Sequence, residues 1–475
     1  MVKKKLFYSL FSRREVLLLG IIILIALFVR VYNLPYVVNY DFDQEYASMF
    51  ANSVVNVYPI QMIGQGLSVQ GLFMGPWYFY YLVPFFLVSG MHPIGGYIGS
   101  IVVGLIITAT YFYTGKLFFD ARTGFVLAIF RALLFNAMIA DWFMAPSYSS
   151  ELILLLMIIS LYKFWHGSKK AIMPIAFLSG LLTSVHPILF PLCLSILVVL
   201  IIKRKFISIK LLGISVILFL IPLSPLIRFE MLRNFLEVKQ LFALSHTNRA
   251  EVKNLTTFIE YVRLIFYFPY NYLRLPDNGI LRIVFSIVGL SLLGYTSVKK
   301  IGFWKDNFHI IMLGSTLLFF LMYYFFLPIH ASDYYFLGAN LLLFMYLLMT
   351  FLLFIKNKKV YVLLIIAGCA ILFFNIEAMI NHVRFPLITL GNKDAVVKAI
   401  VTKEMNQEYG VGYEVGAGWQ YGFGELFRYY DKAYKIKPEK VAKKNIYTIS
   451  STIQKNKGTL LITSGILNVY VRQEN

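Results

Sequence analysis

The chain has 475 residues, of which 59% are hydrophobic and only 14% are charged. A soluble globular domain carries about 25% charged residues, so this composition excludes a wholly water-soluble protein. The net charge is +21, but much of the excess lies in short loops between apolar blocks, where it indicates membrane topology and anionic membrane lipids and not nucleic-acid binding. The two cysteines lie inside apolar blocks, without a CxxC or Cys/His cluster, which argues against a zinc site or a disulfide framework.

Apolar residues form continuous blocks of ~17–25 residues, the length at which a helix crosses a bilayer. Continuous blocks favour helices over the alternating strands of a barrel. The first block follows a basic N-terminus and has no small-residue cleavage site, so we interpret it as a retained first span. About eleven spans are expected, at 16–31, 96–114, 123–140, 149–165, 171–186, 188–202, 211–227, 279–298, 308–327, 335–355 and 360–376.

Lysine and arginine loops decide the expected orientation. The basic N-terminus and the basic loops near 163–170, 203–210, 299–305 and 356–359 are assigned to the cytoplasm. Three units are therefore expected outside: the loops 32–95 and 228–278, and the tail.

Only one crossing then fits between 75 and 115. We assign it to 96–114 and expect the short aromatic stretch 75–90 to lie along or dip into the outer leaflet. A full span at 75–90, with a charge exception elsewhere, is the alternative.

Three carboxylates open the first outer loop: Asp41, Asp43 and Glu45. A carboxylate close to lipid is costly unless it is paired, binds a metal or faces a wet cavity. Residues 46–57 carry apolar side chains at helical spacing and predict an amphipathic helix on the membrane. Two interpretations of Asp43 stay open. It is a base that acts on a substrate at the membrane surface, or it is the N-cap of this helix, with Glu45 favoured in the first turn.

Asp141 is a second carboxylate that the order of the spans places outside. With Asp43 it could hold a hard divalent ion such as Mg or Mn, or orient an acceptor; alternatively it caps the next helix or meets headgroups. Further polar side chains at the outer ends of spans are candidate contacts for a sugar or an acceptor, or interfacial caps. They are His186, His330, Tyr334 and Tyr335.

Arginines recur in the outer loop 228–278, among them Arg228, Arg263 and Arg274. The last two flank the aromatic stretch 266–270, which is expected at headgroup depth. A guanidinium presents several donors to phosphate oxygens, so these residues are candidates to bind a lipid phosphate. Several acids share the loop, and a mixed solvated surface is the alternative.

The tail 377–475 is polar, in contrast to the membrane module 1–376. It combines a helical stretch, Asp394 to Gln407, with strand-like runs at 459–463 and 467–471, which predicts a small α/β domain on the extracytoplasmic side.

Several segments occur in an order and spacing that resemble the GT-C-type membrane glycosyltransferases, the group that includes protein O-mannosyltransferases and the aminoarabinose transferase of lipid A. The resemblance runs over about 16–350 and is strongest over 39–190. The segments that carry it are Asp43-Gln44-Glu45-Tyr46-Ala47, the Gly/Pro-aromatic run from Gly64 to Tyr78, His92-Pro93, Lys116 to Arg122, and Asp141 to Ser147.

The resemblance implies transfer of a sugar, with inversion, from a polyprenyl-phosphate donor to an acceptor hydroxyl on a lipid, glycan or protein at the outer membrane face. It implies that Asp43 is the base and that juxtamembrane helices cover the site. Some members bind a divalent metal through outer-loop acids, for which Asp141 is the nearest second match. Relatives often have Asp–Pro or Asn–Pro after the third span, whereas this chain has Ala145-Pro146, so the use of a metal stays open.

Two other classes remain as alternatives. A non-enzymatic flippase or exporter of lipid-linked glycans would need polar residues at mid-membrane, and the expected spans are poor in them. A polymerase or ligase of lipid-linked glycans would share the donor and the face of the membrane, and the sequence does not separate it from a transferase.

Overall fold

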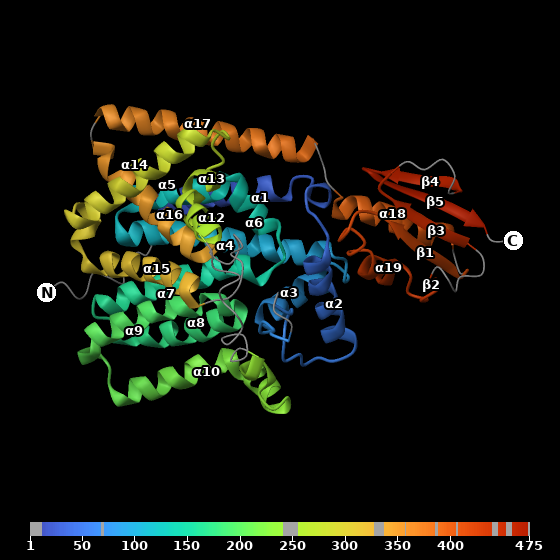
Figure 1. Cartoon of the computed structure of the whole chain (residues 1–475), viewed down its shortest axis with the longest axis horizontal. Helices are drawn as coiled ribbons and strands as arrows, with labels where there is room; N and C mark the ends of the chain where they lie inside the picture. Colours follow the sequence, from blue (N-terminus) through green and yellow to red (C-terminus); the bar gives the residue numbers. More distant parts are fainter. Residues whose placement is uncertain are drawn as a thin grey trace.

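The computed structural model describes residues 12–67, 71–240, 255–326, 337–356, 358–384, 388–404, 407–438, 445–452 and 458–473. A helical bundle and a small C-terminal domain with a β-sheet make up the molecule (Figure 1), which confirms the expected fold class. The helices of the bundle are α1 (Arg13–Val31), α2 (Phe42–Asn56), α3 (Trp77–Val88), α4 (Ile94–Phe118), α5 (Ala121–Leu133), α6 (Phe135–Trp142), α7 (Pro146–Trp165), α8 (Ile172–Val185), α9 (Cys193–Ile202), α10 (Ile209–Leu232), α12 (Leu255–Phe266), α13 (Phe268–Tyr272), α14 (Gly279–Val298), α15 (Asn307–Phe326), α16 (Leu337–Leu352) and α17 (Lys358–Arg384).

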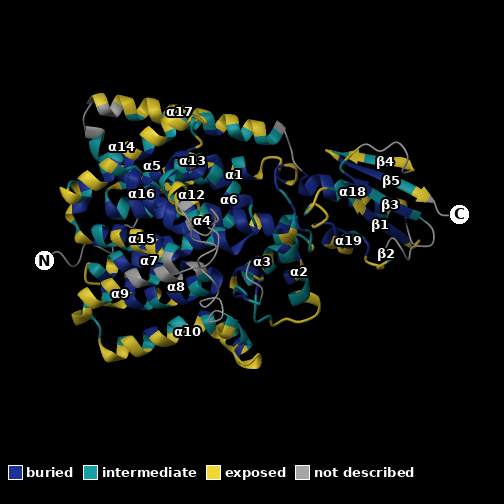
Figure 2. Cartoon of the chain, in the orientation of Figure 1, coloured by how far each residue is buried: buried dark blue, intermediate teal, exposed yellow. Residues whose placement is uncertain are grey.

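Within the described ranges, six helices are long and apolar enough to cross a membrane: α4, α7, α10, α14, α15 and α17. A seventh span is reached if α5 and α6 count as one. Helices α10 and α17 lie on opposite sides of the bundle, and many of their residues are coloured as exposed (Figure 2). Many of these side chains are large and apolar, a surface that suits lipid and not water. The chain is an integral membrane protein with several spans.

Helix α3 covers most of the aromatic stretch 75–90. It has 12 residues, which at ~1.5 Å per residue is too short for a ~30 Å hydrocarbon core. The 25-residue helix α4 that follows is long enough to span. One side of α3 is buried, and the helix packs against α2 and α4. Its depth in the outer leaflet stays a prediction.

The expected span 123–140 is divided between α5 and α6, which meet at an angle of 63°. Leu134 is extended at the break, and backbone groups on both sides lose helical partners. The Arg30 guanidinium of α1 donates to the carbonyls of Arg131 and Ala132 at 3.2 and 2.8 Å. On the other side, Asn375 Oδ1 accepts from the Phe135 N–H at 2.7 Å. The break is stable inside the membrane module because distant side chains replace the lost bonds.

The C-terminal domain begins after α17, which continues to Arg384 and so passes the expected boundary at residue 377. Its five-stranded sheet has the order β2-β1-β3-β5-β4. Strands β1, β2 and β3 pair in parallel, whereas β5 is antiparallel to both β3 and β4. The elements are α18 (Leu390–Lys403), β1 (Tyr409–Glu414), α19 (Gly424–Tyr430), β2 (Ile436–Pro438), β3 (Asn445–Ser450), β4 (Thr459–Ser464) and β5 (Leu467–Gln473).

The expected helix and the two expected strands of this domain are confirmed, with the helix starting at Leu390 instead of Asp394. Helices α18 and α19 lie between the sheet and the bundle, at the end of the bundle that carries α2 and α3 (Figure 1). The domain therefore packs against the first loop of the chain.

Candidate active site

The first turn of α2 places its three carboxylates on two faces. Asp41 is the N-cap, and its N–H donates to Gln44 Oε1 at 3.0 Å. The alternative role of Asp43 as the N-cap is therefore wrong. Asp41 and Glu45 are one helical turn apart and share a face, whereas Asp43 projects from the opposite side.

The face with Asp41 and Glu45 is bonded to the C-terminal domain. Lys393 of α18 donates to Asp41 Oδ1 at 3.1 Å. The two oxygens of Glu45 accept from the backbone N–H groups of Gly422 and Glu425 at 2.8 and 3.1 Å. Both carboxylates thus have fixed partners in another domain.

The opposite face presents Asp43 to the segment 64–75. Gln65 Nε2 donates to Asp43 Oδ1 at 2.5 Å. Burial raises the pKa of Asp43, the Gln65 hydrogen bond opposes this rise, and the neighbouring charge of Asp41 adds to it. A half-buried carboxylate whose pKa is raised suits a general base, because a higher pKa means a stronger affinity for the proton it accepts.

Residues 64–75 form a hairpin, which we call the outer hairpin; its residues 68–70 lie outside the described ranges. The two sides are joined by the Gly64 N–H donating to the Met74 carbonyl at 2.7 Å and the Met74 N–H donating to the Gln65 carbonyl at 2.9 Å. The Gly75 N–H bonds the Ser184 carbonyl of α8 at 2.6 Å. The outer hairpin therefore links the helix that carries Asp43 to α8.

Helix α10 also contacts the outer hairpin. The rings of Phe73 and Phe229 meet edge to face, with centroids 5.6 Å apart. Beyond α10, the carboxyl group of Glu237 makes a hydrogen bond with the backbone of Phe73. Burial and then the charge of Glu230 raise the pKa of Glu237 to about 7. Glu237 was not among the residues predicted from the sequence, because an acid in a loop rich in both charges carries no local signal of burial.

His186 ends α8, two residues after the Ser184 that bonds the outer hairpin. Its side chain is buried, and Nδ1 has no hydrogen-bond partner among the residues that the structure describes. No described bond joins His186 to Asp43. The other candidates for sugar or acceptor contacts, His330, Tyr334 and Tyr335, lie outside the described residues.

Asp141 lies in a buried network of charges. Arg30 Nε donates to Asp141 Oδ2 at 2.6 Å, and Arg131 donates to Oδ2 and Oδ1 at 2.9 and 2.7 Å. Arg131 also bonds Glu151 at 3.0 Å, and the Tyr111 hydroxyl donates to Glu151 at 2.8 Å. Two guanidinium groups thus neutralise the carboxylates and satisfy both oxygens of Asp141.

No described contact joins Asp141 to Asp43, its expected partner in a metal site. The described bonds of Asp141 go to arginines, and two adjacent guanidinium groups repel a further cation. The part of the chain that the structure describes contains no group of three or more His, Cys, Asp or Glu residues placed to hold a metal ion.

The three candidate arginines lie on separate elements and are exposed. Arg228 is in α10, next to the Phe229 that touches the outer hairpin, and Arg263 is in the last turn of α12. The guanidinium of Arg274, just after α13, lies 5.5 Å from the centre of the Phe135 ring. No described contact joins these arginines to one another.

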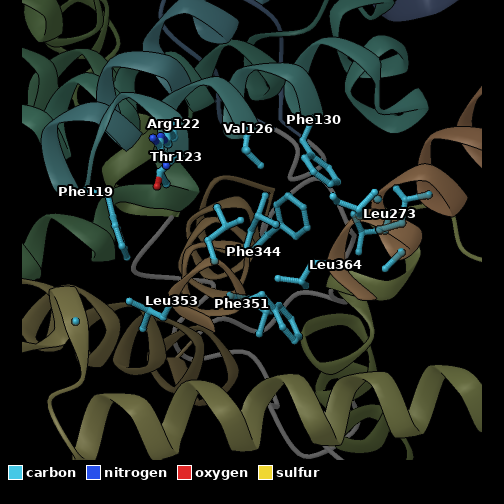
Figure 3. A pocket seen from close by; sticks show the side chains of 18 of the residues that line it. Phe119, Arg122, Thr123, Val126, Phe130, Leu273, Phe344, Phe351, Leu353 and Leu364 are labelled. Atoms are coloured by element: carbon cyan, nitrogen blue, oxygen red, sulfur yellow. The ribbon is translucent and has the colours of Figure 1, made fainter. Parts of the chain in front are cut away.

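A cavity of about 1190 Å³ lies between α5, α14, α16 and α17 (Figure 3). Its walls are mainly apolar, with a few polar side chains from the turn that starts α5. Figure 3 shows Arg122 and Thr123 at one side and Leu273 well apart from them. Leu273 lines this cavity. The next residue in the sequence is Arg274, a candidate to bind a lipid phosphate. The residues of the labelled lining are Phe119, Arg122, Thr123, Val126, Phe130, Leu273, Phe344, Phe351, Leu353 and Leu364.

Comparison with solved structures identifies this fold. The structure of ArnT from Cupriavidus metallidurans bound to undecaprenyl phosphate matches 97% of this chain and 98% of its own, with a TM-score of 0.58 and 11% identity. The oligosaccharyltransferase of Archaeoglobus fulgidus, in complex with Zn and sulfate, matches 91% of this chain and 68% of its own, with a TM-score of 0.50 and 12% identity. No family model and no curated protein sequence matches the chain. The likeness shows a fold of the GT-C type, as the resemblance in the sequence implied.

Proposed function

We propose that this protein transfers a sugar from a polyprenyl-phosphate carrier to an acceptor hydroxyl, with Asp43 as the general base. The observation that carries the proposal is the position of Asp43. It is half-buried, its pKa is raised by burial, and Gln65 Nε2 donates to it. The adjacent Asp41 and Glu45 are bonded to the C-terminal domain. The carboxylate therefore stands apart from its neighbours on a fold that, in ArnT, binds undecaprenyl phosphate.

The chemistry uses one displacement. The acceptor hydroxyl attacks the anomeric carbon of the donor, Asp43 accepts the hydroxyl proton, and the carrier phosphate leaves with the bonding electrons. Attack from the face opposite the leaving phosphate inverts the anomeric centre. A positioned base of this kind contributes roughly 10²–10⁴-fold to the rate.

The leaving phosphate needs cations and no proton, because it departs as an anion. Arg274 and Arg263 are the proposed partners, with Arg228 as a third. The apolar cavity is the proposed site for part of the hydrocarbon chain of the carrier. It is lined by Leu273, the residue before Arg274, and its volume of about 1190 Å³ suits a hydrocarbon chain. An arginine binds phosphate oxygens through two parallel bonds.

The site is proposed to face the extracytoplasmic side. The motive is the placement of the basic loops, together with the packing of the C-terminal domain against α2. Lys398 is exposed on α18 and suits a single cysteine in a chain whose Cys193 and Cys369 are replaced by serine. A membrane-impermeant thiol reagent should label Lys398→Cys in right-side-out vesicles; labelling only in inverted vesicles would reverse the assignment.

Transfer is tested with the purified protein in neutral detergent. A panel of polyprenyl-phosphate sugars with a radiolabelled sugar is incubated with membrane lipids, glycans and peptides as acceptors. We expect one donor to release its sugar to an acceptor in the wild-type protein. We expect release by Asp43→Asn to be roughly 10²–10⁴-fold slower. A protein that only flips the donor across vesicle membranes would leave the label on the carrier with every acceptor.

The matched control is Asp277→Asn. Asp277 is an exposed acid of the other expected outer loop, 228–278, and its described ion pair is with Arg282. We expect wild-type turnover from this variant. Equal turnover of Asp43→Asn and Asp277→Asn would remove Asp43 as the base.

A further inference from the structure

Lys393 of α18 is buried in the contact between the two domains. Its side chain has 0% exposure, although lysine is a residue that rarely leaves water. Its Nζ donates to the carbonyls of Tyr40 and Tyr421, each at 2.6 Å, and to Asp41 Oδ1 at 3.1 Å. Three oxygen partners match the three donors of an ammonium group, so the cost of burying the charge is offset by a complete set of bonds.

These bonds join three segments at the start of α2. Tyr40 and Asp41 directly precede the helix, and Tyr421 belongs to the turn before α19. The same turn supplies the Gly422 N–H that bonds Glu45, in the first turn of α2. The ring of Phe42 also meets the ring of Tyr421, with centroids 5.1 Å apart. The C-terminal domain therefore contacts the first turn of α2 on the face that carries Asp41 and Glu45.

The contact extends beyond the first turn. The Leu390 N–H of α18 donates to the Val38 carbonyl at 2.9 Å, and Asn52 of α2 donates to Glu425 at 3.3 Å. His92, just before α4, lies 3.1 Å from Asp394. The C-terminal domain thus fixes α2 relative to both the preceding chain and α4.

We propose that Lys393 is a positioning residue for the proposed transfer: through Asp41 and Tyr40 it holds the first turn of α2 in the orientation that presents Asp43 to Gln65 and the outer hairpin. The inference rests on the proposed function of Asp43. Asp43 projects from the face opposite Asp41 and Glu45. A rotation of the first turn about its axis therefore moves Asp43 whenever it moves Asp41 and Glu45. The C-terminal domain is then part of the active site without touching the reacting atoms.

The physical reason is the geometry of the carboxylate. A base must lie within about 3 Å of the hydroxyl proton it removes, and small misplacements far from the chemistry cost as much as 10²-fold. Removal of Lys393 leaves two carbonyls and a carboxylate without their donor, and the first turn loses the bonds that set its rotation. Groups that bind the carrier lie elsewhere, so donor binding should persist.

The test compares Lys393→Met with Lys398→Met, since Lys398 lies on the same helix and is exposed. We expect Lys393→Met to lower kcat by 10-fold to 100-fold at an unchanged KM for the donor, and Lys398→Met to match the wild type. Lys393→Arg keeps the charge and several donors and should restore part of kcat. A kcat of Lys393→Met equal to that of Lys398→Met, or a loss confined to KM, would overturn the proposal.

A second measurement does not depend on activity. Hydrogen exchange of the amides of residues 43–46 should be faster in Lys393→Met than in Lys398→Met, with exchange in α7 unchanged. Should Lys393→Met fail to fold, Glu45→Gln weakens the same contact more gently, and a smaller fall in kcat with faster exchange at 43–46 is expected. Unchanged exchange in both variants would contradict the positioning role. Wild-type protein that transfers no sugar would instead refute the proposed function, and the exchange experiment would still test the contact.

Discussion

Asp43 and Asp141 are both carboxylates that the sequence places at outer ends of apolar segments, yet the structure surrounds them differently. Asp141 is buried and receives donors from two guanidinium groups on both of its oxygens. Asp43 is half-buried and receives the amide of Gln65. The charge of Asp141 is compensated by two full positive charges, whereas the charge of Asp43 is compensated by a neutral dipole.

Under the proposed function, the difference separates an acid that stabilises the fold, Asp141, from the proposed base, Asp43. The two guanidinium groups occupy both oxygens of Asp141, so this carboxylate has no free oxygen to offer a substrate. Burial raises the pKa of Asp43. Its carboxylate therefore has a stronger affinity for a proton than an exposed one. The network of Asp141 supports the break between α5 and α6, because the same Arg30 also bonds the free carbonyls there. The following variants test this division of roles.

Replacement of Asp43 by asparagine should have the largest effect. The amide keeps the shape and loses the base, so transfer should fall by roughly 10²–10⁴-fold. The thermal unfolding midpoint in detergent should stay close to that of the wild type, because removing a half-buried charge leaves no cavity. The transfer rate and the unfolding midpoint are measured on the same preparation. A lower midpoint with normal turnover per folded molecule would show that Asp43 acts on stability and is not the base.

Replacement of Asp141 by alanine should act on stability. It leaves Arg30 and Arg131 buried with fewer counter-charges, a loss of about 3–5 kcal/mol for a broken buried pair. Denaturant unfolding in detergent measures this loss. Turnover per folded molecule should change far less than in Asp43→Asn; a stable Asp141→Ala protein without activity would instead assign Asp141 to the chemistry.

Gly104 offers a steric probe of the same network. A Cβ at this position of α4 would overlap the carboxyl group of Asp141. Gly104→Ala should therefore lower the free energy of unfolding by about 1–3 kcal/mol, the usual cost of overpacking. Gly294→Ala, where a Cβ meets nothing within 4 Å, is the control in another spanning helix and should leave stability nearly unchanged.

The smallest expected effect is a shift in pH dependence. The proposed mechanism needs ionised Asp43, so the rate of transfer should fall as the pH drops through the raised pKa of this group. The Gln65 amide favours the ionised form and lowers that pKa. Gln65→Leu should therefore move the acid limb of the pH–rate profile of kcat/KM toward higher pH. An acid limb that stays in place would show that a different group titrates.

The membrane module could be predicted from the sequence because its signal is local. Long apolar blocks such as those of α4 and α17 need no distant partner to be recognised, since the length of the block matches the bilayer. The strands β4 and β5 and the helix α18 were predicted from the same kind of local pattern. The 63° bend between α5 and α6 was not predicted, because it depends on Arg30 and Asn375, which lie far away in the chain.

The candidate site shows the same limit. The sequence by itself singled out Asp41, Asp43 and Glu45 as a group, because three acids beside a membrane segment are costly. Only the tertiary structure shows that Asp41 and Glu45 bond the C-terminal domain, whereas Asp43 bonds the outer hairpin. The reason is physical: a carboxylate's role depends on which donors surround it, and here those donors, Lys393, Gly422 and Gln65, reach α2 only through folding.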